Sequence, residues 1–469
     1  MQVPISSGIY TDNAANYRTS YPVNLVPVPK QTGVAAGYLK KADGITAFNT
    51  DARSGVDRGG INWRGLCYRV IGTQLLRVAA DGVVTAIGTV AAGGQCSFAY
   101  SFDRLAVAAG GNLYYYDGTE LVQVTDADLG VCNDVVFIDG YFLSTDGEFI
   151  VQTELNDPTA VNPLKYGSSE VDPDPLLGLM TLRNELLALN RNTIEFFDNT
   201  GGNLFAFQRI EGALIEKGVV GTHAKCRFAQ SVAFVGSGRN EPPSVYLAGG
   251  GQAQKIATAE IERLLAGYTD DQLSAITCEA REYNAHVHLL IHCPDRTMVY
   301  DLAATAALEQ PIWFFLSSSK VGVGAYRGRS AVYCYSKWIV GDALNGNIGY
   351  LDEKVSTQYG DAVGWQFECG LIYNENKAGQ IHSMELVTLG GRVPLGGSPQ
   401  VFMSYTVDGL TWSDEKIRNQ GLRGDYARRL TWRRVIGRFQ STLGLRFRGC
   451  DNSLGAFSRL DLEIEGLGV

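Results

Sequence analysis

Long hydrophobic runs are missing from this sequence: no window approaches about 18 uninterrupted apolar residues, which excludes a membrane-spanning helix. Charge is also scarce, at 19% of residues against about 25% in an average soluble protein. Acidic residues exceed basic ones and leave a net charge of −9, so we do not expect the whole molecule to bind nucleic acid electrostatically. The segment Met1–Ser7 has neither a basic nor an apolar stretch, and we expect no secretory signal.

Paired cysteines are absent as well. The nine cysteines are scattered singly, and none forms a C-x-x-C pair. An odd, scattered set in a large chain is typical of reduced thiols that serve as small apolar core residues. We therefore expect the chain to stay in a reducing compartment.

Motifs of catalysis and cofactor binding are missing too. The sequence has no G-x-x-x-x-G-K-[ST] phosphate loop, no G-x-S-x-G elbow and no H-E-x-x-H zinc pair. The paired glycines fit turns, and none precedes a helix with a nearby Lys-Ser/Thr. We assign no catalytic residue and no cofactor.

A histidine-rich segment is the sharpest metal-like pattern. In His286-Val-His288-Leu-Leu-Ile-His292 the three histidines share one face of a predicted strand. No cysteine or carboxylate stands at ligand spacing, and the segment spans about 20 Å of strand. We therefore predict an ordinary strand with a histidine-bearing face and no metal site.

Glycine and aromatic residues, in contrast, are abundant. Glycine makes up about 12% of the chain against a usual ~7%, and Tyr, Phe and Trp number 23, 19 and 6. The dipeptide Asp-Gly occurs six times between alternating apolar residues, at 43–44, 81–82, 117–118, 139–140, 146–147 and 408–409. Asp-Gly favours the two positive-φ positions of a type I′ hairpin turn. These features predict an all-β protein of short strands and tight turns.

Comparable β-rich units recur along the chain without a crisp sequence repeat. Blades of about 40–50 residues would place six or seven of them in the span 41–360, which predicts a β-propeller body. A pair of β-sandwiches is the alternative. The units lie near 66–90, 105–124, 134–153, 182–198, 230–248, 286–302 and 331–351.

One segment, near 258–276, interrupts the β pattern. Residues 258–266 predict a short helix that ends at Gly267, with Ile261, Leu264 and Leu265 on one face. Thr269 and Gln272 then have the spacing of a capping box. This helical insertion is either a contact element or a lid on its own blade.

Both ends of the chain differ from the body. Regular alternation, as in Leu443, Leu445 and Phe447, predicts a separate C-terminal β-sandwich over 361–469. Residues 1–40 are polar and marked by prolines, and they predict an N-terminal arm that runs extended and adds to a neighbouring sheet.

Basic residues concentrate in the predicted sandwich. The segment Lys416–Arg448 contains ten basic residues and one acidic residue, which leaves +9 there and −18 elsewhere. Arginine suits bidentate contact with carboxylate or phosphate, so this segment would dock onto an acidic protein surface or line a conduit for DNA. The alternative is a solvated strand face that pairs with Glu463 and Glu465. The predicted partner interface consists of Arg428, Arg429, Arg433, Arg434 and Arg438.

Several ordered runs resemble the tail hub proteins of short-tailed bacteriophages, also called packaged-DNA-stabilisation or tail accessory proteins. The densest match, from about 180 to 305, includes Glu216-Lys-Gly-Val-Val-Gly-Thr222 and Tyr268-Thr-Asp-Asp-Gln-Leu273. Further matches are Tyr21-Pro-Val-Asn-Leu25 near the start and Arg434-Val-Ile-Gly-Arg438 near the end. The resemblance therefore covers essentially the whole chain.

This resemblance implies a structural virion protein of the tail that assembles in the host cytoplasm. Family members form a homohexameric ring below the portal and the head-to-tail adaptor. They close the DNA channel after packaging and attach the tail needle and the tailspikes or fibres, so DNA is expected only to pass through.

Two other functions remain open from the residues. A propeller-type glycan-binding or glycan-cleaving protein is one alternative, since Thr406-Val-Asp408-Gly409-Leu-Thr411-Trp412 is similar to the Asp-box turn of sialidase-type propellers. A DNA-binding protein is the other, and the net charge of −9 argues against it.

Overall fold

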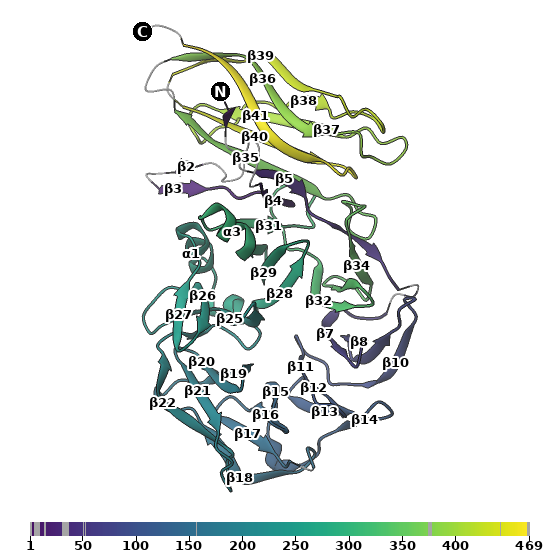
Figure 1. Ribbon diagram of the computed structural model, residues 1–469, viewed down its shortest axis with the longest axis vertical. Helices are drawn as coiled ribbons and strands as arrows, with labels where there is room; N and C mark the ends of the chain where they lie inside the picture. Colours follow the sequence, from purple (N-terminus) through teal and green to yellow (C-terminus); the bar gives the residue numbers. More distant parts are fainter. Residues whose placement is uncertain are drawn as a thin grey trace.

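Two all-β bodies lie along the long axis of the computed structural model (Figure 1). The structure describes residues 2–3, 10–13, 16–30, 37–49, 51, 53–155, 157–373, 378–440 and 442–466. One body is a ring of sheets and the other is a two-sheet sandwich. None of the helices in the described part of the chain has the length and apolar character needed to cross a membrane.

The ring is a propeller whose described residues form seven antiparallel sheets. Neighbouring blades contact one another around the ring, and the inner strand of the last blade contacts that of the first. This closure leaves only short sheet edges exposed. The structure confirms the predicted propeller with seven blades.

The first four blades follow the chain in order, each as a meander of four strands. Blade one has β7 (Asp57–Trp63), β8 (Leu66–Ile71), β9 (Gln74–Val78) and β10 (Val84–Thr89). Blade two has β11 (Ser97–Tyr100), β12 (Leu105–Ala109), β13 (Asn112–Tyr116) and β14 (Leu121–Gln123). Blades three and four have β15 (Asp134–Ile138), β16 (Tyr141–Thr145), β17 (Phe149–Thr153), β18 (Val161–Ser168), β19 (Leu176–Leu182), β20 (Glu185–Asn190), β21 (Ile194–Asn199) and β22 (Phe207–Ile215).

The last blade takes its outer strand from the start of the chain. In blade seven, β34 pairs with β6 (Gly44–Ala47), with Leu351 opposite Ile45. The N-terminal region therefore closes the ring across about 300 residues of sequence. Blades five to seven otherwise have β23 (Gly218–Val219), β24 (Lys225–Phe228), β25 (Ser231–Ser237), β26 (Ser244–Gly249), β27 (Gln252–Lys255), β28 (Thr277–Tyr283), β29 (His286–His292), β30 (Thr297–Asp301), β31 (Trp313–Leu316), β32 (Gly328–Cys334), β33 (Lys337–Asp342) and β34 (Ile348–Asp352).

A buried ion pair joins blades near the centre of the ring. The Oδ2 atom of Asp134 on β15 lies 2.7 Å from Nζ of Lys225 on β24 and accepts a hydrogen bond from the Leu179 amide of β19. Burial opposes ionisation of Asp134, but the Lys225 ammonium holds the pKa of this carboxyl below its ordinary value. Gly178 passes so close that an added Cβ would lie 2.7 Å from Nζ. A side chain there would displace the pair.

Three short α-helices and the 3-10 helix η1 (Ala127–Leu129) accompany the strands in the described residues. α1 (Ala259–Ala266) and α2 (Asp270–Ser274) form the predicted insertion, with Ile261 and Leu265 buried against blades five and six. Thr269 and Gln272 form the predicted capping box. The insertion is thus a lid packed on its own blades. α3 (Leu302–Leu308), which we did not predict, begins after Asp301, whose carboxylate accepts from the Ala304 amide.

The C-terminal body is the predicted sandwich. One sheet has the order β39–β36–β41–β5–β4, with β1 also paired to β41, and the other has the order β35–β40–β37–β38. Leu443, Leu445 and Phe447 are fully buried between the sheets, as their alternation predicts. The strands are β35 (Gly364–Tyr373), β36 (Gly379–Leu389), β37 (Gln400–Thr406), β38 (Lys416–Asn419), β39 (Leu430–Phe439), β40 (Thr442–Cys450) and β41 (Ala456–Gly466).

The N-terminal region adds to a sheet of its own chain. β4 (Leu25–Pro29) and β5 (Gly37–Lys41) belong to the sandwich, where β5 pairs with β41. β1 (Gln2–Val3) pairs with the same strand, and β2 (Tyr10–Asn13) pairs with β3 (Asn16–Thr19) as a hairpin. The second half of the segment 1–40 is therefore built into the sandwich rather than separate from it.

Asn24 fastens the propeller to the sandwich. Its buried side chain donates to the carbonyls of Ser317, after β31, and Gly364, at the start of β35, and accepts from the Ser317 amide. Its φ of 52° lies in the left-handed region, which asparagine tolerates better than most residues. Asn24 thus connects three segments that are far apart in sequence.

Replacing Asn24 with alanine should therefore loosen the junction. The change leaves two buried carbonyls and one amide without their partner and adds left-handed backbone strain, so we expect a loss of about 2–4 kcal/mol of stability. Differential scanning calorimetry measures the loss, together with any separation of the propeller and sandwich transitions. Asn184→Ala, at an exposed position in the β19–β20 turn, is the control and should change little. An unchanged thermogram for Asn24→Ala would contradict this role.

The Asp-Gly turns are mostly of a different type from the one predicted. Asp139-Gly140 alone among the six has positive φ at both residues, 49° and 89°, as a type I′ turn requires. At 81–82, 117–118, 146–147 and 408–409 only the glycine has positive φ, and the aspartate accepts hydrogen bonds from amides two or three residues ahead. This carboxylate bond stabilises a turn in which the aspartate does not need a positive φ. At 43–44 the two residues link β5 to β6 instead of forming a hairpin.

All nine cysteines are unpaired. Eight are buried or half-buried, and only Cys450 is exposed. Burial raises the pKa of the core thiols, for example that of Cys67 to about 11, so they stay protonated and pack as small apolar side chains. This agrees with the prediction from their spacing.

Candidate assembly surface

The predicted interface arginines lie on an edge strand of the sandwich and in the loop that precedes this strand. β39 is the outermost strand of its sheet and pairs with β36 (Figure 1). Trp432, Ile436 and Phe439 on this strand are buried in the sandwich core. Arg433, Arg434 and Arg438 stand between them and are exposed. The core side chains therefore fix the strand and leave the arginines facing solvent.

A bulge separates the arginines within β39. The register steps from Ser383 opposite Arg433 to Ile381 opposite Ile436, which gives β39 one extra residue. Arg434 sits in this bulge with φ of 51°. Bulges and charged side chains are two devices by which edge strands avoid unwanted pairing with other sheets. Protection of the edge is thus one role that these residues can fill.

The five predicted residues differ in their partners. Arg429 makes a bidentate contact with Glu385, with Nε 2.8 Å from Oε1. Among the described residues, no ion pair reaches the other four, Arg428, Arg433, Arg434 and Arg438. The expected alternative partners have different contacts: Glu463 accepts from Ser383, and Glu465 contacts His382. Pairing with these glutamates therefore does not account for the exposed arginines.

Other basic residues of the segment 416–448 are occupied within the sandwich. Arg446 lies 2.5 Å from a Glu368 oxygen and stacks over Trp412. Arg448 donates to Glu415, and Arg418 donates to the Thr431 carbonyl. The basic residues of the segment that have no ion pair among the described residues therefore lie on β38, on β39 and in the loop between these strands.

Exposed apolar side chains lie in the loops beside Arg428, and the sequence analysis missed them. Leu395 is 85% exposed, Tyr426 is 70% exposed and Leu422 is 57% exposed. The loops that carry them touch, because an added Cβ on Gly391 would lie 2.8 Å from the Tyr426 ring. Arginine and tyrosine are enriched in the binding cores of protein interfaces. We call this region, with Arg428, Arg433, Arg434 and Arg438, the sandwich-edge surface.

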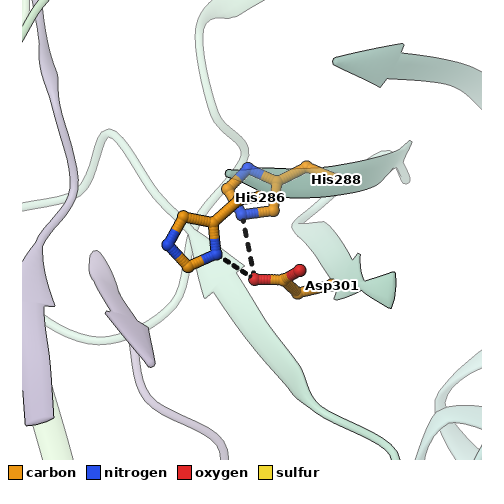
Figure 2. A group of neighbouring side chains, drawn as sticks. All are labelled: His286, His288 and Asp301. Carbon is orange, nitrogen blue, oxygen red and sulfur yellow. Dashed lines mark hydrogen bonds and ion pairs between the residues drawn. The ribbon is translucent and has the colours of Figure 1, made fainter. Parts of the chain in front are cut away.

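The histidine segment differs from its prediction in one respect. His286 and His288 on β29 converge on Asp301, a carboxylate at the end of the adjacent strand β30 (Figure 2). His292 lies apart and contacts Glu279 and Thr297. The search for ligands at short spacing missed Asp301, although the hairpin register places it directly opposite His288.

The turn at Asp408 is structural. Its carboxylate accepts from the amides of Leu410 and Thr411 and from the hydroxyls of Thr406 and Thr411. The hydrogen bonds from the hydroxyl and the amide of Thr411 are the main reason why the pKa of Asp408 lies far below its ordinary value. These bonds occupy both oxygens and close the loop after β37.

The fold and this surface define a propeller-and-sandwich protein that presents a basic, partly apolar edge. The family model described as "Bacteriophage P22 Gp10, beta-propeller" matches residues 1–356, and "Bacteriophage P22 Gp10, beta-sandwich" matches residues 364–465. The chain belongs to this family. The "Tail hub protein gp10" of Salmonella phage P22 is 29% identical to it over 490 residues and is covered to 99%, as is this chain. The predicted resemblance is confirmed.

Matches to solved structures are weak in both superposition and sequence identity. PorZ of Porphyromonas gingivalis has a TM-score of 0.39 and 10% identity, covering 80% of this chain and 46% of its own. The WD40 domain of Pan2 from Neurospora crassa has a TM-score of 0.42 and 9% identity, covering 66% of this chain and 95% of its own.

The family assignment settles the broad class of function. This chain is a structural protein of the phage tail hub type and not an enzyme, as the sequence analysis predicted. The family also supports a place in the virion.

Proposed function

We propose that this protein forms a homohexameric ring below the portal and the head-to-tail adaptor. In this position it closes the DNA channel after packaging and carries the tail needle and the tailspikes or fibres. The sandwich-edge surface makes one of the protein contacts of the ring, either with the next subunit or with the adaptor. DNA passes through the assembled channel without sequence-specific binding.

The relationship to a tail hub protein over 99% of both chains carries this proposal. Since both domains are matched, the chain has the parts that such a hub uses. The arrangement of charge agrees with protein contacts. Arg428, which has no ion pair among the described residues, lies in the loop that carries the exposed Tyr426, and three further exposed arginines follow on the edge strand β39. A carboxylate-bearing partner would neutralise them by bidentate contacts.

Retention of packaged DNA tests the proposed function. Purified protein is added to DNA-filled heads that carry portal and adaptor, and nuclease-accessible DNA is measured. We expect leakage to stop when about six copies per head are bound, because a closed ring of identical subunits has a fixed copy number. Heads without adaptor are the control and should not bind the protein.

The possible outcomes test the hexamer and the hub function separately. Binding of a number other than about six, with leakage stopped, would contradict the hexamer alone. Continued leakage with no bound protein would contradict the hub function. Quantitative mass spectrometry of the sedimented heads gives the copy number.

A further inference from the structure

The convergence of His286, His288 and Asp301 forms a compact group of potential metal ligands. The Nδ1 atom of His286 lies 2.5 Å from Oδ2 of Asp301, and the Nε2 atom of His288 lies 3.4 Å from the same oxygen (Figure 2). One ligand atom from each residue lies within 4.8 Å of the other two. Ligands bound to one zinc ion at 2.0–2.1 Å are about 3.4 Å apart in a tetrahedral site. The three side chains thus have the separation that one ion requires after a small adjustment.

The buried ring of His288 has two nitrogens that lack a well-placed hydrogen-bond partner, as expected for a residue whose ligand is absent. Its side chain is 4% exposed, and neither ring nitrogen makes a hydrogen bond of good geometry with the described residues. Unsatisfied buried polar groups are costly, and native proteins avoid them.

Asp301 is held in place by a contact outside the cluster. Its Oδ1 accepts a hydrogen bond from the Ala304 amide at the start of α3, which leaves Oδ2 directed at the histidines. The ring of His288 also packs against the edge of Phe314. Contacts of this kind orient the ligands of natural metal sites.

His286 provides the access and the freedom to adjust. Its side chain is 12% exposed at the start of β29, beside the turn that follows β28. Binding an ion would move its ring about 1 Å away from Asp301, since the present 2.5 Å is shorter than the spacing of two ligands. A partly exposed residue at a strand end can make this movement.

We propose that His286, His288 and Asp301 bind one divalent transition-metal ion, with zinc as the ion that suits two imidazoles and one carboxylate. Water would complete the coordination. The ion would connect β29 and β30 to α3, which contacts β4 of the sandwich. The site is therefore structural and stiffens the side of the propeller that faces the junction.

Arg281 sets the expected strength of binding. It lies opposite His288 in the β28–β29 register and is buried. Its positive charge opposes that of the ion, so we expect a Kd on the order of micromolar rather than the tighter values of closed four-ligand sites.

Zinc titration of the tag-free, chelator-treated full chain tests the proposal. Calorimetry should give one ion per chain and a higher Tm in the presence of zinc. His286→Asn and Asp301→Asn should each weaken binding at least tenfold; Asp301→Asn keeps an acceptor for the Ala304 amide, so the helix cap is retained. His382→Asn, at the exposed histidine beside Glu465, is the matched control and should bind zinc as the wild type does.

Cobalt(II) gives a readout that does not depend on the folding of any variant. The wild-type chain should show the visible spectrum of a low-coordinate cobalt site without a thiolate charge-transfer band, which distinguishes it from binding at Cys450. Absence of zinc binding, a thiolate band, or unchanged affinity in His286→Asn would overturn the proposal. Loss of binding in His382→Asn would place the ion on the sandwich and overturn it equally.

Discussion

Arg433→Glu/Arg434→Glu is expected to weaken assembly by at least about 100-fold, measured as the protein concentration needed to form rings or to bind adaptor-bearing heads. Removing one partner of a close interfacial charge pair costs about 2–5 kcal/mol, and the new carboxylates would also repel an acidic partner. Both residues are exposed, so the monomer should stay folded, with an unchanged circular dichroism spectrum and Tm. Light scattering and sedimentation with heads measure the two kinds of assembly.

Arg77→Glu/Arg183→Glu is the matched control, because it makes the same change in net charge at two exposed propeller positions. A second double variant, Arg433→Val/Arg438→Val, separates contact from edge protection, and it leaves Arg434 at its positive φ, which a β-branched residue would not tolerate. If the arginines only protect β39 from pairing with other sheets, the glutamate variant assembles normally, because its charges protect the strand edge equally well. The valine variant then aggregates, because its edge carries fewer charges. Normal assembly of the glutamate variant would therefore remove these residues from the proposed interface.

Local patterns made most of the architecture predictable. The seven β-rich units found in the sequence correspond one to one with the seven described blades, and the alternation around Leu445 marks the sandwich core. Helix α2 was predictable from Thr269 and Gln272, because a capping box is a contact between neighbours in sequence. Each of these signals depends on residues that lie a few positions apart.

Pairings across long stretches of sequence were not predictable in the same way. β6 joins blade seven, and β5 joins the sandwich sheet, through backbone hydrogen bonds that depend on register rather than residue type. Asp301, in the proposed metal site, is a second example of a position that depends on strand pairing. Its position beside His288 follows from a hairpin between β29 and β30, and a search along the sequence for close ligands does not detect it.

The arginines illustrate what charge alone can and cannot predict. Their clustering identified the surface correctly as basic, but the sequence could not show which arginines were already paired. Arg429 contacts Glu385 on β36, whereas Arg433, on the strand paired with β36, has no ion pair among the described residues. The distinction depends on the register of the two strands, which places the uncharged Ser383 opposite Arg433.

Asp134→Ala is expected to cost about 3–5 kcal/mol of stability, the second large effect. The change leaves the Lys225 ammonium buried without its counter-charge, and the side chains of the pair are only 5% and 6% exposed. It also removes the acceptor for the Leu179 amide, so three blades lose a shared contact. Urea unfolding measures the loss. Glu241→Ala, which breaks the more exposed pair with Lys217, is the control and should change the stability little.

The double variant Asp134→Ala/Lys225→Met tests whether the buried charge is the cause. If it is, removing Lys225 as well should recover part of the loss, because no uncompensated ion remains. The pH dependence gives a second test. Since the folded pKa of Asp134 is depressed, its contribution is complete above the unfolded value of 3.8 and disappears as the pH falls below it. The difference between wild type and Asp134→Ala should therefore narrow in acid; a constant difference would mean that the lost packing of the side chain, and not its charge, supports the ring.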